Sequence, residues 1–277
     1  MTARDPHRFV AELDDATIDR LINRLESRGK DAVFTRLFDA YVARMRLSPS
    51  AQILEIGCGT GVVVRTLARR EGFSGRVTGI DQSPAFIETA RRLAAEEGLD
   101  QHVEFRVGDA HALEEEDGRY DAVIIHTVVS HVTDPLSVLR EAARLVRIGG
   151  MVAVFDGDYE SLTYAYPDHA VGRAMDRALV ETAFNNPLVM RGMAQLLSDA
   201  GLELEETLAD VVAEIGTGSY FVSMAETYAP MISSSGLLPA EKVDAWLAEQ
   251  HRALDWGTFF AACNYYAFLA RRPVSAG

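Results

Sequence analysis

The sequence predicts an α/β fold built on a doubly wound, mostly parallel sheet, and three observations support it. The segment 53–61 is a short apolar strand that runs directly into three glycines spaced two residues apart. A helix pattern follows at about 60–70, so strand, glycine turn and helix come in succession. Strand and helix patterns then alternate as far as residue 156, an order that requires parallel pairing and right-handed crossovers.

Two helices are expected before the first strand. Residues 9–28 and 32–46 carry apolar side chains at helical spacing, and the run from Arg28 to Lys30 is predicted to separate them. From the residue pattern alone, we expect these helices to pack on the edge of the sheet.

Four further strands are predicted between the glycine turn and residue 156. They are 75–83, 103–110, 120–135 and 145–156. A helix at 84–97 lies between the first two, with Ser83 as its cap and Pro84 in its first turn. Glu114–Asp117 is expected to form a solvated turn.

The pattern is less regular after Asp156. A polar and aromatic stretch occupies 157–169. Helices are predicted at about 170–184, 188–200, 219–233 and 239–254, and strands at 202–215 and 259–273.

Composition limits the classes of partner. The chain has 277 residues, enough for one large domain or a core with a cap, and 48% of them are hydrophobic. Its net charge is −14 and no basic run is present, which disfavours nucleic acid and anionic membrane surfaces. No apolar stretch is as long as a membrane span. The N-terminus lacks an apolar signal segment, and Cys58 and Cys263 are expected to be free thiols, so we expect a cytoplasmic protein.

The glycine turn distinguishes two classes of nucleotide-like ligand. Dinucleotide enzymes use G-x-G-x-x-G, but the position of the third glycine is Val62, and the spacing here is E-x-G-x-G-x-G. This motif resembles the first motif of class I S-adenosylmethionine (SAM)-dependent methyltransferases. The predicted strands resemble the further landmarks of that family in order, ending in Asp81, in Asp109-Ala110 and in His126.

The resemblance implies a Rossmann-like, seven-stranded, mostly parallel sheet with an antiparallel last strand, N-terminal helices over the cofactor and a helical cap. It is strongest over 50–156 and is similar to the ubiquinone and menaquinone type. We expect the following segments: 1–48, N-terminal helices; 49–156, SAM-binding core; 157–187, cap insertion; 188–218, helix and sixth strand; 219–256, helical cap insertion; 257–277, last strand and C-terminus.

The resemblance also implies roles for residues around SAM. Asp81 would accept from the ribose hydroxyls, with the alternative that it caps the next helix. Asp109 would accept from the adenine amine beside the Ala110 N–H, with the alternative of a local Asx turn. Glu55 would contact the methionine amino group. The remaining cofactor-binding candidates are Gly57, Cys58, Gly59, Gly61, Gln82 and the backbone carbonyl of His126.

Methyl transfer from a sulfonium is an in-line displacement, so positioning and a dry pocket supply much of the acceleration. A base is needed only where the acceptor must lose a proton. His131 and His126 are the candidates, with buried packing as the alternative for each, and His169 is expected to be exposed. Other side chains with possible roles at the site are Tyr159, Tyr164 and Tyr166 as an aromatic lining, Asp156, Asp158 and Glu160 as magnesium ligands, and Arg191 as an anion contact.

We therefore predict a SAM-dependent methyltransferase that acts at O, N or C of a small organic acceptor and uses no metal. A homodimer is a further hypothesis. Two alternatives stay open. A protein of the same fold could bind SAM and catalyse a cyclisation or serve as a binding subunit. A nicotinamide-dependent oxidoreductase is disfavoured by Val62.

Overall fold

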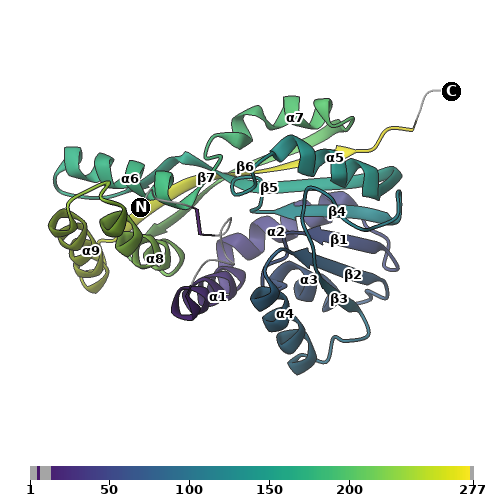
Figure 1. The fold of residues 1–277 in the computed structure, drawn as a ribbon, viewed down its shortest axis with the longest axis horizontal. Helices are drawn as coiled ribbons and strands as arrows, with labels where there is room; N and C mark the ends of the chain where they lie inside the picture. Colours follow the sequence, from purple (N-terminus) through teal and green to yellow (C-terminus); the bar gives the residue numbers. More distant parts are fainter. Residues whose placement is uncertain (1–4, 7–13, 275–277) are drawn as a thin grey trace.

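The computed structural model describes residues 5–6 and 14–274. A seven-stranded sheet forms its centre, with strand order β3-β2-β1-β4-β5-β7-β6 (Figure 1). Strands β1 to β5 pair in parallel, whereas β7 runs antiparallel to both β5 and β6. This order confirms the predicted doubly wound fold with its antiparallel last strand. The strands are β1 (Gln52–Ile56), β2 (Arg76–Asp81), β3 (Val103–Val107), β4 (Tyr120–His126), β5 (Val146–Tyr164), β6 (Glu203–Ile215) and β7 (Phe260–Arg271).

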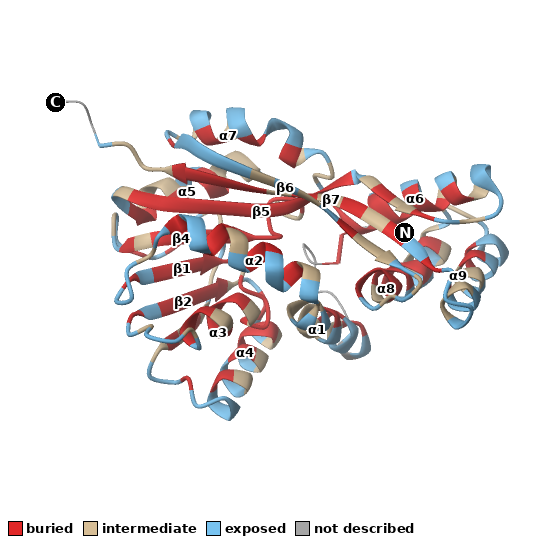
Figure 2. Cartoon of the chain, turned by 180° about the vertical axis from the view of Figure 1, so that it is seen from behind, coloured by how far each residue is buried: buried red, intermediate tan, exposed pale blue. Residues whose placement is uncertain are grey.

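Helices cover both faces of the sheet because alternate strand residues feed two separate cores. Ile53 of β1 belongs to one core, whereas its neighbour Leu54 belongs to the other. The first core takes in residues of α2, α3 and α4, and the second takes in residues of α5 and α7. These helices are α2 (Ala32–Met45), α3 (Val62–Ala68), α4 (Pro84–Glu96), α5 (Pro135–Leu145) and α7 (Met193–Asp199). Figure 2 shows the central strands as largely buried.

The first helix differs from the prediction at its end. Helix α1 (Asp15–Lys30) continues through Gly29, and the chain breaks at Asp31, whose carboxylate caps α2 by accepting from Val33 N. Glycine is required at position 29 because α1 packs closely on α3 there: a Cβ would lie 2.4 Å from Cγ1 of Val62. The predicted start of this helix at residue 9 lies outside the described residues.

The fifth strand is longer than the sequence indicates. It does not end near Asp156 but continues to Tyr164, because β7 continues to pair with it beyond that point, at Asp158 with Asn264 and at Tyr164 with Ala261. The register shifts between Asp158 and Thr163. The polar and aromatic stretch after Asp156 is therefore partly strand, and the sheet extends outward beyond the core.

Three helices gather around this outer part of β5 and β7 (Figure 1). They are α6 (His169–Ala183), α8 (Tyr220–Ser235) and α9 (Ala240–Asp255), close to the predicted ranges. A short 3-10 turn, Val189–Gly192, precedes α7. Helix α1 contacts both α3 of the core and α8 of this outer group. Among the described helices, none is long and apolar enough to cross a membrane.

The sequence suggested that the acidic turn before β4 is solvated, but one of its side chains is buried. The Glu115 side chain is only 2% exposed and accepts from Arg119 Nη1 at 2.6 Å. It also bonds Arg106 and the Tyr120 hydroxyl. Two guanidinium groups make burial of this carboxylate tolerable.

Candidate functional site

A cavity of about 390 Å³ lies at the carboxyl ends of β1, β2 and β4, where α1 covers it. This is where a doubly wound sheet places its ligand. Nearly all the predicted site residues line it: Glu55, Gly57, Cys58, Gly59, Asp81, Gln82, Asp109, Ala110, His126 and His131. The fold thus brings these residues together at one cavity, and their roles toward a ligand stay predictions.

The glycine turn is tied to the neighbouring strand. Gly57 and Gly59 have φ of 72° and 52°, in the left-handed region that favours glycine. The backbone N–H groups of Gly57 and Cys58 both donate to the Ile80 carbonyl, at 2.7 and 3.0 Å. A Cβ on Gly57 would lie 2.4 Å from a methyl of Val128, in the loop after the neighbouring strand β4. This close approach of the backbone also requires glycine.

Gly61 and Cys58 serve packing more than lining. Gly61 is the cap of α3 and does not line the cavity; a Cβ there would lie 2.6 Å from the Phe105 ring. The Cys58 thiol is buried, and this burial raises its pKa well above the usual value. A protonated, buried thiol has little nucleophilic character.

Asp81 holds the turn in place. One of its oxygens, Oδ2, accepts from Gly59 N at 2.8 Å, and Oδ1 accepts from Ser83 N at 2.9 Å. The helix cap that was the alternative role for Asp81 is made by the Ser83 hydroxyl, which accepts from Phe86 N. Burial raises the pKa of Asp81, although these two backbone donors oppose the shift.

Glu55 is a buried carboxylate in the crevice with one oxygen left unsatisfied. It is 3% exposed, and its Oε2 has no hydrogen-bond partner among the described residues. Burial raises its pKa well above the usual value; the Val64 backbone and Arg28 counteract this only in part. A buried, unsatisfied carboxylate on the cavity wall is suited to a ligand that brings a cation and N–H donors.

Asp109 lies at the open side of the cavity. Its side chain is 69% exposed, and Oδ1 accepts from the backbone N–H of His111 at 3.0 Å and from the His111 ring at 2.7 Å. The local turn proposed as the alternative is thus present, and it lowers the pKa of Asp109. Ala110 and Gln82 line the same cavity.

His131 pairs with a residue far away in the sequence. Its Nδ1 lies 2.8 Å from Oδ2 of Asp5, whose side chain is 4% exposed. The ring also lies against Phe184, with centroids 5.4 Å apart. A carboxylate on Nδ1 fixes the orientation of an imidazole. The His131 ring is thus held in one orientation at the cavity.

The loop that carries His131 is fixed from two sides. The carboxylate of Asp156, fully buried, accepts from Ser130 N at 3.1 Å, and burial raises its pKa. The Ser130 carbonyl accepts from the backbone N–H groups of Asn185 and Asn186. The Asn185-Asn186-Pro187 break between helices therefore supports the site as well as ending α6.

His126 has a different environment. Its Nδ1 lies 2.9 Å from the Tyr41 hydroxyl, and its ring stacks on Phe155 with centroids 4.6 Å apart. Burial lowers its pKa well below the usual value, so the ring is neutral and set in the aromatic core. This environment favours the packing alternative for the side chain.

Several other candidates lie in different places. Tyr159 lines the cavity and stacks on Phe184, whereas Tyr164 is buried against Trp246. His169 is exposed, as predicted, and Tyr166 is partly buried in the outer core. Arg191 pairs with Asp158 at 3.0 Å, so the ordinary salt bridge is present. Among the described residues, no three acidic, histidine or cysteine side chains are grouped as metal ligands.

Two arginines one helical turn apart were missed by the sequence analysis. Arg24 and Arg28 of α1 line the cavity, as does Tyr220 of α8. In the sequence, an arginine that lines a cavity cannot be distinguished from one on the solvated face of an amphipathic helix. No sequence pattern therefore predicts a role for these two arginines. Their significance depends on how α1 sits over the glycine turn.

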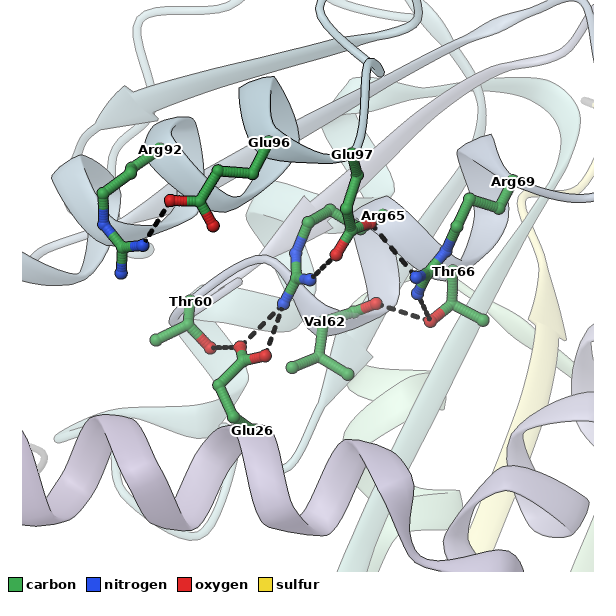
Figure 3. Close-up of polar contacts among 9 residues, drawn as sticks. All are labelled: Glu26, Thr60, Val62, Arg65, Thr66, Arg69, Arg92, Glu96 and Glu97. Carbon is green, nitrogen blue, oxygen red and sulfur yellow. Dashed lines mark hydrogen bonds and ion pairs between the residues drawn. The ribbon is translucent and has the colours of Figure 1, made fainter.

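Helix α1 is anchored by Glu26 (Figure 3). Both Glu26 oxygens accept from Arg65 Nη2, at 2.7 and 2.8 Å, and Oε1 also accepts from the Thr60 hydroxyl at 2.6 Å. The Arg65 side chain is 5% exposed and also pairs with Glu97. One carboxylate thus joins α1 to the glycine turn and to α3.

Comparison with known proteins agrees with this architecture. The model of a methyltransferase domain family matches residues 47–194, more than half of the chain. The chain belongs to this family. Its predicted place among the class I SAM-dependent methyltransferases is confirmed, and SAM is accordingly the cofactor. The residues present fit it: the turn has no side chains at Gly57 and Gly59, and Glu55 offers an unsatisfied buried oxygen.

Similar proteins include an uncharacterised 37.1 kDa protein in transposon TN4556 of Streptomyces fradiae, 35% identical over 85% of this chain and 65% of its own length. A ubiquinone biosynthesis O-methyltransferase of Aeromonas salmonicida is 40% identical over 37% of this chain and 42% of its own length. The chain thus spans less than two thirds of each. A solved structure from Bacillus halodurans C-125 shares the fold, with a TM-score of 0.60 and 18% identity over 86% of this chain and 99% of that one.

Removing the Glu26 anchor should destabilise the protein. We expect Glu26→Gln to lower the free energy of unfolding by about 2 kcal/mol, since it leaves the buried Arg65 with one carboxylate partner. Urea denaturation followed by circular dichroism measures this. The control is Glu96→Gln, which removes the exposed pair with Arg92 (Figure 3) and should change stability by less than about 0.5 kcal/mol. Equal effects of the two variants would contradict the anchoring role.

The raised pKa of Glu55 predicts a pH dependence of the ligand-free protein. At pH values below the usual range for glutamate, about 4, the carboxyl is neutral whether the chain is folded or not. As the pH rises to 7, the unfolded chain ionises while the folded protein resists, so wild type should lose stability relative to Glu55→Gln. Melting temperatures of the two proteins across this range test it, and a constant difference between them would refute the prediction.

Proposed function

We propose that the protein transfers the methyl group of SAM to O, N or C of a small organic acceptor. Membership in the methyltransferase family and the fit of the crevice support this. The observation that carries the proposal is the combination, in one cavity, of the glycine turn fixed by Asp81 with an oriented histidine, His131.

The wall formed by β1 and β2 would hold the cofactor. Asp81 would accept from the ribose hydroxyls while it keeps Gly59 in position, and Asp109, Ala110 and Gln82 would surround the adenine. Glu55 would take the ammonium group, which would supply the partner that its Oε2 lacks. Arg28, close enough to lower the pKa of Glu55, would take the cofactor's carboxylate.

The opposite wall would prepare the acceptor. When bound, SAM supplies a methyl group on a positively charged sulfur. His131 would remove a proton from the acceptor atom, with Asp5 orienting the ring as a positioning residue. The aromatic rings of Tyr159, Phe184 and Tyr220 would exclude water from this end. His126 would contribute its backbone carbonyl to the cofactor's ammonium group, since its ring is held by Tyr41 and Phe155.

The remaining parts of the prediction stand as proposals. The net charge of −14 supports a small molecule rather than nucleic acid as the acceptor. Two buried free thiols support a reducing, cytoplasmic location. A homodimer remains a hypothesis for solution measurement. The non-methylating alternatives, a cyclase or a binding subunit, would use the same cofactor residues and are separated from transfer by experiment.

Binding of the cofactor's product tests the first wall. We expect Asp81→Ala to weaken binding of S-adenosylhomocysteine by about 1–3 kcal/mol, because the ribose loses a charged acceptor and Gly59 loses its tether. Isothermal titration calorimetry measures the affinity, and circular dichroism checks the fold. The control is Asp100→Ala, which removes an exposed carboxylate after the end of α4 and should leave the affinity unchanged. Unchanged affinity in Asp81→Ala would remove Asp81 from the cofactor site.

Methyl transfer itself tests the second wall. Incubation with SAM and a broad panel of phenols, enols, amines and carboxylic acids, followed by mass spectrometry, should show an acceptor that gains one methyl group. With that acceptor, His131→Gln should lower kcat by about 10²-fold or more, and His169→Gln, an exposed histidine, should not. Binding of S-adenosylhomocysteine without any methylated product would instead favour the cyclase or binding-subunit alternative.

A further inference from the structure

A buried guanidinium group lies in the cavity with neutral partners. Arg24 is 7% exposed and lines the cavity. Its Nη1 donates to the Tyr228 hydroxyl and its Nη2 to the Tyr220 hydroxyl, the latter at 3.4 Å. Its Nε has no hydrogen-bond partner among residues 5–6 and 14–274. The group also lies over the Tyr228 and Tyr220 rings, 5.0 and 5.5 Å from their centroids.

A charge in such a place is costly unless an anion completes it. Arginine keeps its proton inside proteins, and an unpaired buried charge is strongly unfavourable. Within the described part of the chain, no carboxylate forms an ion pair with Arg24, although Arg65, also buried, has two. The rings and hydroxyls of Tyr220 and Tyr228 stabilise the cation only in part. The structure therefore contains a positive charge whose counterion is absent from the described residues.

The geometry of the free positions indicates what kind of anion fits. Nε and Nη2 share one edge of the planar guanidinium. Within the part of the chain that the structure describes, Nε has no partner and Nη2 makes one long bond. Two parallel N–H groups on one edge match the two oxygens of a carboxylate. The edge is thus suited to a planar anionic group with two oxygens.

The surroundings place this anion site beside the proposed base. Tyr159 and Tyr220 line the same cavity, and Tyr159 stacks face to face on Phe184 with centroids 3.4 Å apart. Phe184 in turn lies against His131. The cation, the flat rings and the imidazole therefore border the same cavity.

We propose that Arg24 selects an acceptor that carries a carboxylate, or an anionic group of the same shape, beside the atom to be methylated. The proposal rests on the proposed function, since it assigns the acceptor end of that site. Arg24 pairs with the anion, while Tyr159 and Tyr220 contact the acceptor's flat face and His131 meets the methylated atom. The acceptor is thus a small organic acid, with neutral analogues discriminated against.

The test uses two probes of equal shape and different charge. The full-length protein is saturated with S-adenosylhomocysteine, and 3,4-dihydroxybenzoate and 3,4-dihydroxybenzamide are titrated separately by calorimetry. We expect the benzoate to bind roughly tenfold or more tightly than the amide, the effect of one charge-assisted pair. Equal affinity of the two, or no binding of the benzoate at millimolar concentration, would overturn the proposal.

Variants separate recognition from structure. Arg24→Met should abolish the preference for the benzoate, and Arg24→Lys, which keeps the charge but loses the planar fork, should reduce it severalfold. Tyr228→Phe removes the tether from α1 to α8 and should lower the melting temperature while keeping the preference. Arg20→Met, an exposed arginine on the same helix, should change neither. An Arg24→Lys protein with the full wild-type preference would contradict the proposal, as would retained preference in Arg24→Met.

Binding of S-adenosylhomocysteine in the same titrations keeps this proposal distinct from the proposed function. If the product binds and the benzoate does not, the anion site is wrong while the cofactor site stands. If the product itself fails to bind, the proposed function fails first.

Discussion

Everything at the site depends on how the turn after β1 is held against the end of β2. Three consecutive backbone N–H groups, of Gly57, Cys58 and Gly59, donate to the Ile80 carbonyl and the Asp81 carboxylate. These bonds fix a backbone that could otherwise sample many conformations, since glycine is the least restricted residue. Asp81, at the end of β2, and Glu55, near the end of β1, both line the cavity. An acid is needed at position 81 because its carboxylate both holds the glycine turn and lines the cavity.

Helix α1 gives the cavity its second side. Glu26 joins it to the glycine turn through Thr60 and to α3 through Arg65, while Arg24 joins it to α8. Gly29 allows the helix to approach α3 closely. The same helix therefore connects the sheet end of the cavity with the outer group of helices and lines the cavity between them.

The sequence predicted the sheet, the crevice and its acidic residues because these follow from local chemistry. A left-handed turn demands glycine, and an acid at the end of a parallel strand lies beside that turn whatever the rest of the chain does. The pairing of His131 with Asp5 could not be predicted, since it joins residues 126 positions apart. Arg24 was missed because its significance depends on its partners in the fold, which are tyrosine hydroxyls from α8, about 200 positions away in the sequence. The long β5 was missed because strand length depends on its partner β7, not on its own pattern.

The segment that contains the outer helices α8 and α9 begins and ends at the same point of the sheet. The chain departs after Ile215 and returns at Phe260, and these two residues pair directly across β6 and β7. The entropy of closing such a loop varies only slowly with its length, so the strands keep their register whatever is inserted between these points. The insert therefore supplies Tyr220 to the cavity from a segment whose two ends are fixed by one strand pair.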